Sequence, residues 1–350
     1  MNACSTAAPT SVEPTPDEHT PVAPSTMRAA VARSYGTAEV VAVEEVPTPA
    51  AASGEVLVSV EASSLNALDW HFLTGTPYLI RLVGGLRHPR RVIHGADVAG
   101  TVVAVGADVS TFEVGDRVFG ECGGGGFAPY LTAKVGGLVP IPSGVTFEAA
   151  GATPVAGLTA LQGLRTHGAT KPGEHVLING AAGSVGTFSV QIAKALGAEV
   201  TAVCSTRNVD MVARLGADHV VDYTADDFVE GGARFDVMLD NVGNRSAAEC
   251  ISVLRPGARY VAVSGPKDNR WLGPIPHVAR TWFAFRRADA TFHQFTASPN
   301  HADLEFLGEL LAHGSVVPEI QRTIGLDGVA DGLAEIGSAH ARAKILVTPT

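Results

Sequence analysis

The chain is poor in cysteine, and its four cysteines lie far apart. Cys4, Cys122, Cys204 and Cys250 show no Cys-x-x-Cys spacing, which argues against a zinc ribbon or a dithiol redox motif. We expect reduced thiols, with Cys204 and Cys250 as core residues, because they fall in an apolar strand-like run and a helical pattern. The chain also lacks any stretch near the ~18 apolar residues of a membrane span, so no membrane partner is expected.

Positive charge is scarce as well. The sequence has 25 Lys and Arg against 35 Asp and Glu, a formal net charge of -10, and its basic residues are scattered. This composition argues against a nucleic-acid partner or an anionic membrane surface. Residues 1–26 contain no Lys or Arg and consist mainly of Ala, Thr, Ser and Pro, unlike a signal or transit peptide. We interpret them as a disordered tail, with the folded chain starting near Met27 in a cytoplasmic protein.

Two patterns divide the rest of the chain. Residues 27–151 contain short β-rich runs, such as 55–60 and 100–106, broken by Gly, Pro and Asp. After residue 151, strand-like runs alternate with stretches of helical length, which predicts an α/β fold with a parallel sheet covered on both faces. The expected strands are 175–179, 199–204, 219–222, 236–240 and 260–263, and the expected helices are 184–196, 209–215 and 246–254. The apolar run 344–347 belongs by composition with the first part.

The clearest motif is a glycine-rich loop between an expected strand and an expected helix. It reads Gly180-Ala181-Ala182-Gly183-Ser184-Val185-Gly186 and follows the strand 175–179 directly. Glycines there let the backbone approach a pyrophosphate, and the helix start supplies unpaired N–H groups with a partial positive charge. The loop therefore predicts a dinucleotide site, with Gly180, Gly183, Ser184, Val185 and Gly186 in contact with the cofactor.

The end of the next strand selects between the two nicotinamide cofactors. An Asp or Glu there would hold the free ribose hydroxyls of NADH, whereas NADPH needs cationic or hydroxyl groups for its 2′-phosphate. The residues after Cys204 are Ser205, Thr206 and Arg207, without a carboxylate. A guanidinium can bind a phosphate through two parallel hydrogen bonds. We expect NADPH as the cofactor, with an ordinary exposed arginine as the alternative for Arg207.

From Met27 to Val347 the chain resembles the medium-chain dehydrogenase/reductase superfamily, in its quinone oxidoreductase and enoyl reductase branch. The motifs that carry the resemblance, besides the glycine loop, are 95–100 with 105–106, 114–118, 157–160, 215–218, 240–243 and 343–347. The resemblance implies an irregular GroES-like β-barrel catalytic domain (27–151 and 299–350), a Rossmann-type domain (152–298), a cleft between them, and a homodimer joined through a strand near 290–295. Further cofactor contacts implied by it are Thr159, Tyr223, Asn241, Val242, Val263 and Lys344.

The chain departs from the zinc alcohol dehydrogenases of the same superfamily. Those enzymes place a Cys in the loop where this chain has Asn66, and a His-Glu pair where it has Ala96 and Asp97. Zinc needs three or four converging N, S or O ligands, and these are replaced. We therefore expect no metal, and we interpret His94 as an ordinary histidine.

The zinc-free branch has no metal ion to act as a Lewis acid. The resemblance therefore implies hydride transfer to a quinone or to a C=C bond conjugated with a carbonyl. The expected catalytic residues are Asn66 and Tyr78, which can donate hydrogen bonds to the oxygen that gains charge. Asp69 is expected to orient its loop. The alternatives are a dedicated enoyl reductase of a polyketide-like pathway and a non-catalytic NADPH-binding protein. The aromatic stretch 270–295 fits either a pocket for a flat acceptor or a dimer interface.

Overall fold

The computed structural model describes residues 23–265, 269–338 and 341–349. Most of the tail predicted for residues 1–26 therefore lies outside the described residues. The first strand, β1 (Thr26–Ala32), pairs antiparallel with β2 (Val41–Pro47) and forms a two-stranded sheet. Strand β1 thus begins where the composition changes, at the first apolar run after the Ala/Thr/Ser/Pro-rich segment.

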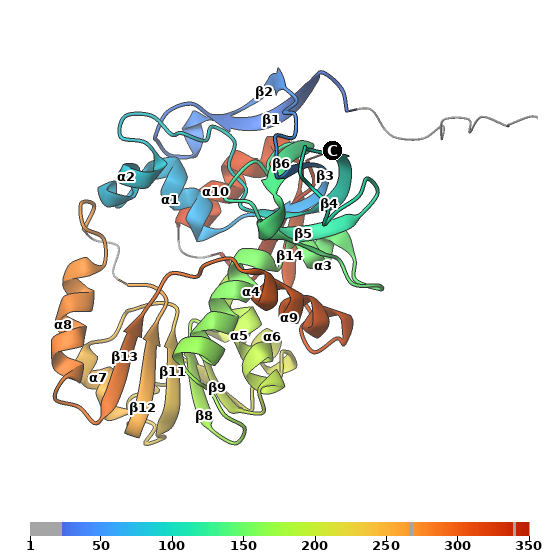
Figure 1. The fold of residues 1–350 in the computed structure, drawn as a ribbon. Helices are drawn as coiled ribbons and strands as arrows, with labels where there is room; N and C mark the ends of the chain where they lie inside the picture. The colour runs from blue at the N-terminus through green and yellow to red at the C-terminus, as the bar shows by residue number, and fades with distance from the viewer. Residues whose placement is uncertain (1–22, 266–268, 339–340, 350) are drawn as a thin grey trace, which may run out of the picture.

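A seven-stranded, mostly antiparallel sheet forms the upper part of the molecule in Figure 1. Its strands are β3 (Glu55–Ser64), β4 (Asp97–Val105), β5 (Arg117–Glu121), β6 (Tyr130–Lys134), β7 (Leu138–Pro140), β14 (Ile320–Ile324) and β15 (Lys344–Val347). The spatial order is β14-β15-β3-β4-β5-β7, and β6 pairs with β3. Since β15 pairs with β3, the chain returns to this sheet at its end, as its apolar composition predicted.

The second sheet has six parallel strands. They are β8 (His175–Asn179), β9 (Glu199–Cys204), β10 (His219–Asp222), β11 (Phe235–Asp240), β12 (Leu254–Ala262) and β13 (Ala290–Gln294). The order β10-β9-β8-β11-β12-β13 is that of a doubly wound dinucleotide fold, in which the strand order reverses beside the first strand. The predicted α/β class, with a Rossmann-type sheet and a GroES-like part, is confirmed.

Ten α-helices occur in the described residues. They are α1 (Ala67–Thr74), α2 (Arg81–Gly84), α3 (Phe147–Gly151), α4 (Pro154–Leu161), α5 (Ser184–Ala195), α6 (Val209–Arg214), α7 (Ala247–Ser252), α8 (Ile275–Phe285), α9 (His301–Ala312) and α10 (Val329–Gly337). α5 and α6 begin at the predicted residues, and Cys204 and Cys250 are buried as expected. None of these helices has the length and the apolar composition to cross a bilayer.

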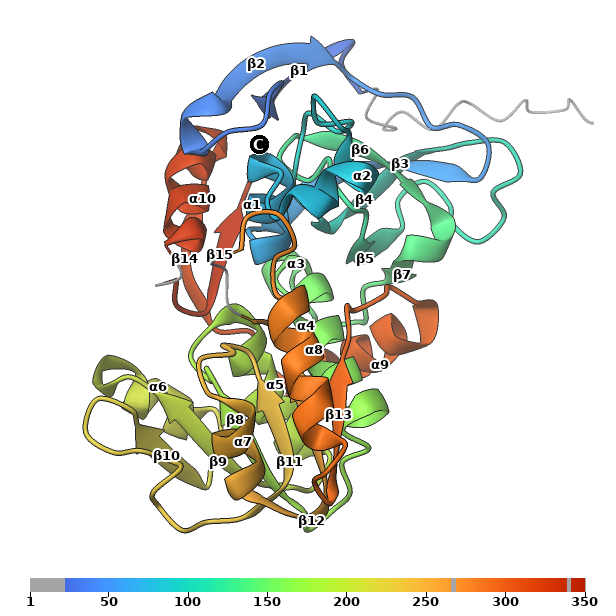
Figure 2. The same cartoon turned by 90° about the vertical axis from the view of Figure 1, so that its left-hand side faces the viewer.

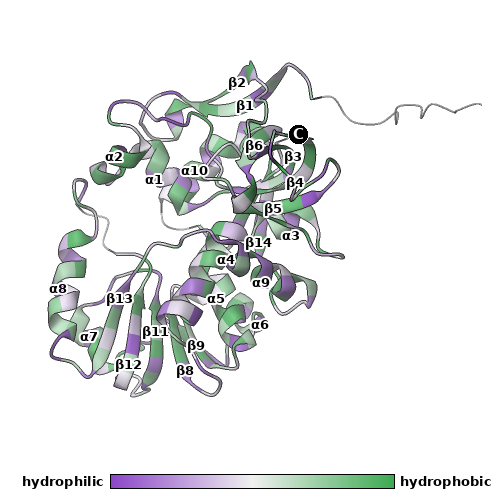
Figure 3. Cartoon of the chain, in the orientation of Figure 1, coloured by the Kyte–Doolittle hydropathy of each residue, from purple (hydrophilic) through white to green (hydrophobic). Residues whose placement is uncertain are grey.

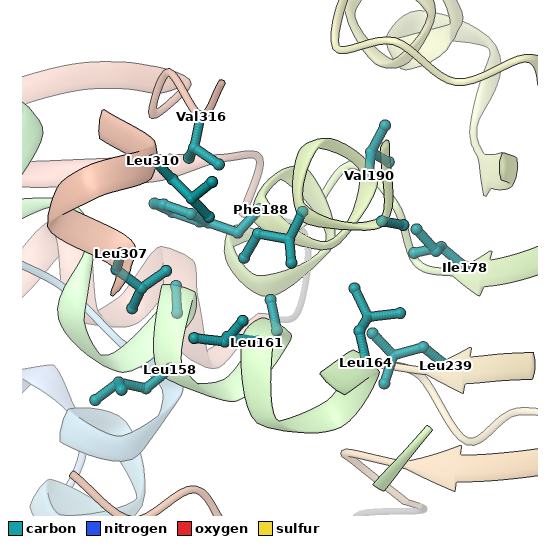
Figure 4. Close-up of a cluster of buried hydrophobic side chains, with 14 of the residues drawn as sticks. Leu158, Leu161, Leu164, Ile178, Phe188, Val190, Leu239, Leu307, Leu310 and Val316 are labelled. Carbon is teal, nitrogen blue, oxygen red and sulfur yellow. The ribbon is translucent and has the colours of Figure 1, made fainter. Parts of the chain in front are cut away.

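The largest hydrophobic cluster joins α4 and α5 to α9. Figure 4 shows Leu158 and Leu161 beside Phe188 and Leu307, and all four side chains are fully buried. Truncating one such side chain to alanine typically costs about 2–5 kcal/mol. The cluster continues to Phe119 of β5, so the core links both sheets. α9 belongs to residues that the resemblance assigns to the catalytic domain, yet it packs on helices of the six-stranded sheet.

The outer helices differ from this interior. Figure 2 shows α8 running along the outside of the molecule below α2. Figure 3 colours α8 in a mixture of hydrophobic and hydrophilic tones. Its Trp282 and Phe283 are exposed by 46% and 65%, whereas Phe285 packs inward against Tyr260. The helix therefore presents apolar side chains on two faces.

Candidate active site

The glycine-rich loop turns directly from β8 into α5. Gly180 has φ +79°, in the left-handed region that favours glycine. A Cβ on Gly186 would lie 2.2 Å from the carbonyl oxygen of Gly180, so only glycine lets the first turn of α5 pack this closely on the strand end. The sequence context of the motif, strand then loop then helix, is confirmed.

The loop has the features that a bound pyrophosphate requires. A Cβ on Gly183 would meet only the carbonyl oxygen of Gly180, at 3.7 Å, which leaves space in front of the helix. α5 has 12 residues and starts at Ser184, so the N–H groups of its first turn lack helical acceptors. The side-chain oxygen of Asn241 is buried there without a hydrogen-bond partner among the described residues. The loop and its surroundings fit a dinucleotide.

Asp240 organises the neighbouring loop at the point where the strand order reverses. Its Oδ1 accepts hydrogen bonds from Asn179 at the end of β8 (2.9 Å) and from the backbone N–H groups of Val242 (3.0 Å) and Gly243 (2.9 Å). Its Oδ2 accepts one from Tyr260. Ligands of such sheets bind at this reversal point. Asp240 was not among the predicted site residues, although a carboxylate at the last position of a buried strand was a signal for it.

The end of β9 gathers hydroxyls, a guanidinium and one carboxylate. Ser205, Thr206 and Arg207 follow the strand, and the latter two are exposed. Thr206 lies 2.7 Å from the hydroxyl of Thr224, which donates to Asp222. Hydrogen bonds from the Thr206 side chain and the Thr224 backbone lower the pKa of Asp222. The sequence placed no carboxylate on this strand, but the parallel neighbour β10 brings one beside it.

The other predicted cofactor contacts lie around the same edge of the six-stranded sheet. Tyr223 directly follows β10 and is 60% exposed. Val242 lies two residues after the end of β11 and is 41% exposed. Val263 follows β12, with its N–H donating to the carbonyl oxygen of Asp240. Thr159 lies on α4, where its hydroxyl donates to the carbonyl oxygen of Val155.

Lys344 lies beneath the site rather than on its surface. Its side chain is fully buried, and its Nζ donates to Asn66 Oδ1 (2.7 Å) and to Asp97 Oδ2 (3.1 Å). The Asn66 amide also donates to Asp97 (2.8 Å) and to the carbonyl oxygen of Ser64 (3.2 Å). Asn66, Asp97 and Lys344 form a network whose polar atoms already have partners, and we call it the buried triad.

This placement changes the roles expected for two residues. Lys344 was expected to contact the cofactor, but its ammonium faces Asn66 and Asp97, with no exposed surface. Asn66 is only 3% exposed, and its amide would have to exchange a partner to reach a substrate. The signal that the sequence offered was Asp97 itself, an acid within an apolar strand, which needs a compensating charge when buried.

The residue before Lys344 connects the buried triad to the cofactor loop. The backbone N–H of Ala343 donates to the carbonyl oxygen of Ala182 (2.9 Å), and the Ser184 hydroxyl donates to the carbonyl oxygen of Ala343 (2.7 Å). Ala343 itself has φ +52°, an unusual conformation for alanine that its neighbours must hold in place. Ala343 and the first residue of β15, Lys344, thus contact the glycine loop and Asn66, respectively.

Two further carboxyl groups lie next to the buried triad. Asp69 accepts hydrogen bonds from the backbone N–H groups of Asn66 (2.9 Å) and Gly95 (3.0 Å), in agreement with its expected role in orienting the loop. Burial and the nearby Asp97 carboxylate raise the pKa of Asp69 to about 7. Burial, followed by Asp97 and Asp69, likewise raises the pKa of Glu121 to about 7.

Tyr78 lies at a contact between the two halves of the molecule. Its backbone N–H donates to the carbonyl oxygen of Arg270 (2.8 Å), and its ring meets the edge of Trp271 at 5.1 Å. Arg81 lies over the Tyr78 ring at 4.7 Å. No partner for the Tyr78 hydroxyl is found in residues 23–265, 269–338 and 341–349, which leaves it able to donate to a ligand.

The aromatic stretch 270–295 serves more than one purpose. Trp271 contacts Tyr78, on the side where an acceptor is expected. Phe285 and Phe292 pack on Tyr260 in the core, at ring distances of 5.3 and 5.6 Å. Trp282 and Phe283 are exposed on α8 beside β13, the edge strand of the sheet. The stretch is therefore partly core and partly open surface.

Comparisons with known proteins agree with this fold. Residues 52–143 match the family model of the alcohol dehydrogenase GroES-like domain, and residues 215–347 match that of zinc-binding dehydrogenases. The chloroplast envelope quinone oxidoreductase homolog of Arabidopsis thaliana is 32% identical over 322 residues, which cover 87% of this chain and 93% of that protein. The trans-enoyl reductase pgmF of Aspergillus terreus (strain NIH 2624 / FGSC A1156) is 32% identical over 321 residues, covering 84% and 86%.

A solved structure shows the same architecture. The quinone oxidoreductase from Coxiella burnetii superposes with a TM-score of 0.82 at 26% identity, covering 93% of this chain and all of that chain. Both sheets and their connections therefore have an experimentally determined counterpart.

Proposed function

The chain belongs to the medium-chain dehydrogenase/reductase superfamily, and from this premise we propose that it is an NADPH-dependent quinone or enone reductase that works without zinc. Enzymes of this superfamily are oxidoreductases that bind a nicotinamide cofactor. The finer points, namely NADPH, the absence of catalytic zinc and the acceptor, are our proposal. The observation that carries it is the buried triad at the place where zinc-dependent relatives have metal ligands.

The preference for NADPH is supported by the end of β9. Arg207 is exposed there beside Ser205 and Thr206, which carry hydroxyl groups. Asp222 is already engaged by Thr206 and Thr224, so its oxygens have partners other than a ribose. A 2′-phosphate would meet a cation and several donors here.

Zinc independence is supported by the charge at the buried triad. Lys344 places a cation in contact with Asn66 and Asp97. A zinc ion at the same residues would face this ammonium and would gain one amide and one carboxylate in place of the usual imidazole and thiolate ligands. We propose that Lys344 neutralises Asp97 and holds Asn66 in one orientation.

The bound cofactor supplies the hydride, and the protein has to hold the acceptor and stabilise the charge that develops on its oxygen. We assign this donor role to the Tyr78 hydroxyl, which is unpartnered in the described residues. Asn66 is 3% exposed and held by Lys344, so we assign it to the floor of the site, where it contacts the reacting groups only after exchanging a partner. Trp271 borders the acceptor through its contact with Tyr78.

The test is consumption of NADPH with a panel of quinones, conjugated enones and saturated ketones. Oxidation of NADPH with quinones or enones and not with saturated ketones supports the proposal. Equal turnover of a saturated ketone contradicts the acceptor assignment. Tight NADPH binding without any turnover favours the non-catalytic alternative.

A dedicated enoyl reductase is the second candidate, favoured by the 32% identity to a trans-enoyl reductase. It predicts that an enoyl thioester is reduced with a higher kcat/KM than any free quinone.

We further propose a homodimer through β13, because this edge strand lies beside the exposed Trp282 and Phe283. Sedimentation of the native chain and of Phe283→Glu tests this assembly: the native chain should sediment as a dimer and the variant as a monomer.

A further inference from the structure

Three possible metal ligands converge at the opposite end of the six-stranded sheet from the cofactor loop. His175, Glu199 and His219 are the first residues of β8, β9 and β10. Each offers one ligand atom, and these atoms lie within 4.8 Å of one another. We propose that this cluster, the strand-start site, binds a divalent transition-metal ion of the zinc class.

The sheet register brings the three side chains to one face. His175 is the direct neighbour of Glu199 across β8 and β9, and His219 is the neighbour of Thr201 across β9 and β10. Glu199 and Thr201 are two residues apart on one strand and so point to the same side of the sheet. Adjacent strands lie about 4.8 Å apart, which places ligands from three strands around one point.

One ligand is already held in position. The Nε2 of His175 lies 2.8 Å from the Thr201 hydroxyl, and the edge of Phe235 packs on the ring at 4.7 Å between centroids. His175 is only partly exposed. The Thr201 and Phe235 contacts therefore fix the ring of His175 on the same face as Glu199 and His219.

The other two ligands are exposed and adjustable. His219 Nε2 lies 2.9 Å from Glu199 Oε1, and this contact lowers the pKa of Glu199. A metal at ordinary bond lengths of about 2.0–2.2 Å would separate these two atoms slightly and draw His175 closer, and water would complete the coordination. Glu199 and His219 are exposed and can adjust by rotamer changes.

The donor set selects the metal. Two imidazoles and one carboxylate suit zinc, cobalt, nickel and copper, whereas calcium and magnesium prefer oxygen ligands. The nearby Asp236 and Asp218 carboxylates are paired with Arg255 and Lys194, so Glu199 supplies the net negative charge. The bound ion would add a link between three parallel strands and would stabilise the native state.

The strand-start site is separate from the catalytic chemistry. His175 and Gly180 are five residues apart along β8 and the start of the loop, about 16 Å at the usual rise of ~3.3 Å per residue. A metal here therefore does not conflict with zinc-independent hydride transfer. Zinc found on the purified protein must therefore be assigned to the strand-start site or to the catalytic site before a catalytic role is inferred from it.

The test titrates the full-length, chelator-stripped protein with ZnCl₂ by calorimetry, and with CoCl₂ by visible spectroscopy. We expect one saturable site, tetrahedral-type Co²⁺ bands and a metal-dependent rise in Tm. His219→Ala and Glu199→Gln should each weaken Zn²⁺ binding by about tenfold or more, with NADPH oxidation unchanged. His301→Ala is the matched control, since His301 and Glu305 form an exposed pair of the same type on α9.

Each outcome decides the proposal. Loss of binding and of the Tm rise in both ligand variants, with the control unchanged, supports the strand-start site. Saturable binding that persists in both variants, or an equal loss in His301→Ala, overturns it, as does a native chain that shows no saturable site.

Discussion

Lys344 Nζ and Asp97 Oδ2 form an ion pair of 3.1 Å in which both side chains are completely buried, although 247 positions separate them in the chain. The pair links β15 to β4, and both side chains are hydrogen-bonded to Asn66. Burying two charges is stable only when their other polar atoms are also hydrogen-bonded. The other carboxylate oxygen of Asp97 accepts a hydrogen bond from the backbone N–H of Val155 at 2.8 Å.

Breaking this pair should destabilise the protein strongly. Lys344→Met leaves the Asp97 carboxylate buried without its cation, which typically costs about 3–5 kcal/mol. Adding Asp97→Asn removes the uncompensated charge and should recover a substantial part of that loss. Urea unfolding of the single and double variants measures both effects. A double variant that is no more stable than Lys344→Met would show that charge compensation is not the reason for the pair.

Cofactor preference should depend on Arg207. We expect the native chain to use NADPH over NADH by about tenfold or more in kcat/KM, because a charge-assisted hydrogen bond contributes about 1.5–3 kcal/mol. Arg207→Ala should raise the KM for NADPH and leave the KM for NADH nearly unchanged. Arg214→Ala, which changes an exposed arginine on α6, is the control. Equal use of both cofactors by the native chain contradicts the assignment.

The Tyr78 hydroxyl should matter for the reacting acceptor and not for the cofactor. Loss of one donor to a developing oxyanion typically lowers kcat about 10²–10³-fold, so Tyr78→Phe should lower kcat by about tenfold or more with an enone or quinone. The Kd for NADPH should not change. Tyr35→Phe is the comparison, because the Tyr35 hydroxyl is already bonded to the carbonyl oxygen of Gly85. An unchanged kcat in Tyr78→Phe removes this residue from the proposed machinery.

Activity should survive removal of metal ions. Incubation with a strong chelator should leave NADPH oxidation intact, because we propose that the Lys344 ammonium, and not a metal ion, neutralises Asp97 in the buried triad. The strand-start site predicts that any zinc found by elemental analysis disappears in His219→Ala without a change in rate. A chelator-sensitive rate that Zn²⁺ restores would contradict zinc-independent catalysis.

The free energy of unfolding should fall as the pH rises, because the buried Glu121 loses its proton. The folded chain holds the proton of Glu121 up to about pH 7, because burial and the Asp97 and Asp69 carboxylates raise its pKa, whereas an unfolded Glu titrates near 4.5. Unfolding therefore releases this proton between about pH 4.5 and 7, and its stabilising effect is lost as the pH rises through that range. Glu121→Gln removes the effect, so its stability relative to the native chain should increase from pH 5 to pH 8. Urea titrations at these pH values measure it, and a difference that does not vary with pH would refute the assignment.

The sequence pattern alone predicted five of the six strands of the parallel sheet and the cofactor loop. Strand and helix periods, and glycines at Gly180 and Gly186, are local features, because the residues that make a strand, a turn and a helix start are neighbours in the chain. The start of α5 at Ser184 and the exact span of β8 follow from this locality. The first sheet was less predictable, since its strands are irregular and pair across long separations, and β15 joins it from the end of the chain.

Only the tertiary structure decided which side chains share an environment. Lys344 was expected at the cofactor, but folding buries it against Asn66 and Asp97, because a charge inside an apolar sheet has to lie next to its counter-charge wherever that is in the chain. The register of the parallel strands places Asp222 next to Thr206, and His175 next to Glu199 and His219. Local patterns specify elements, whereas these contacts depend on strand order and register, which the sequence pattern does not contain.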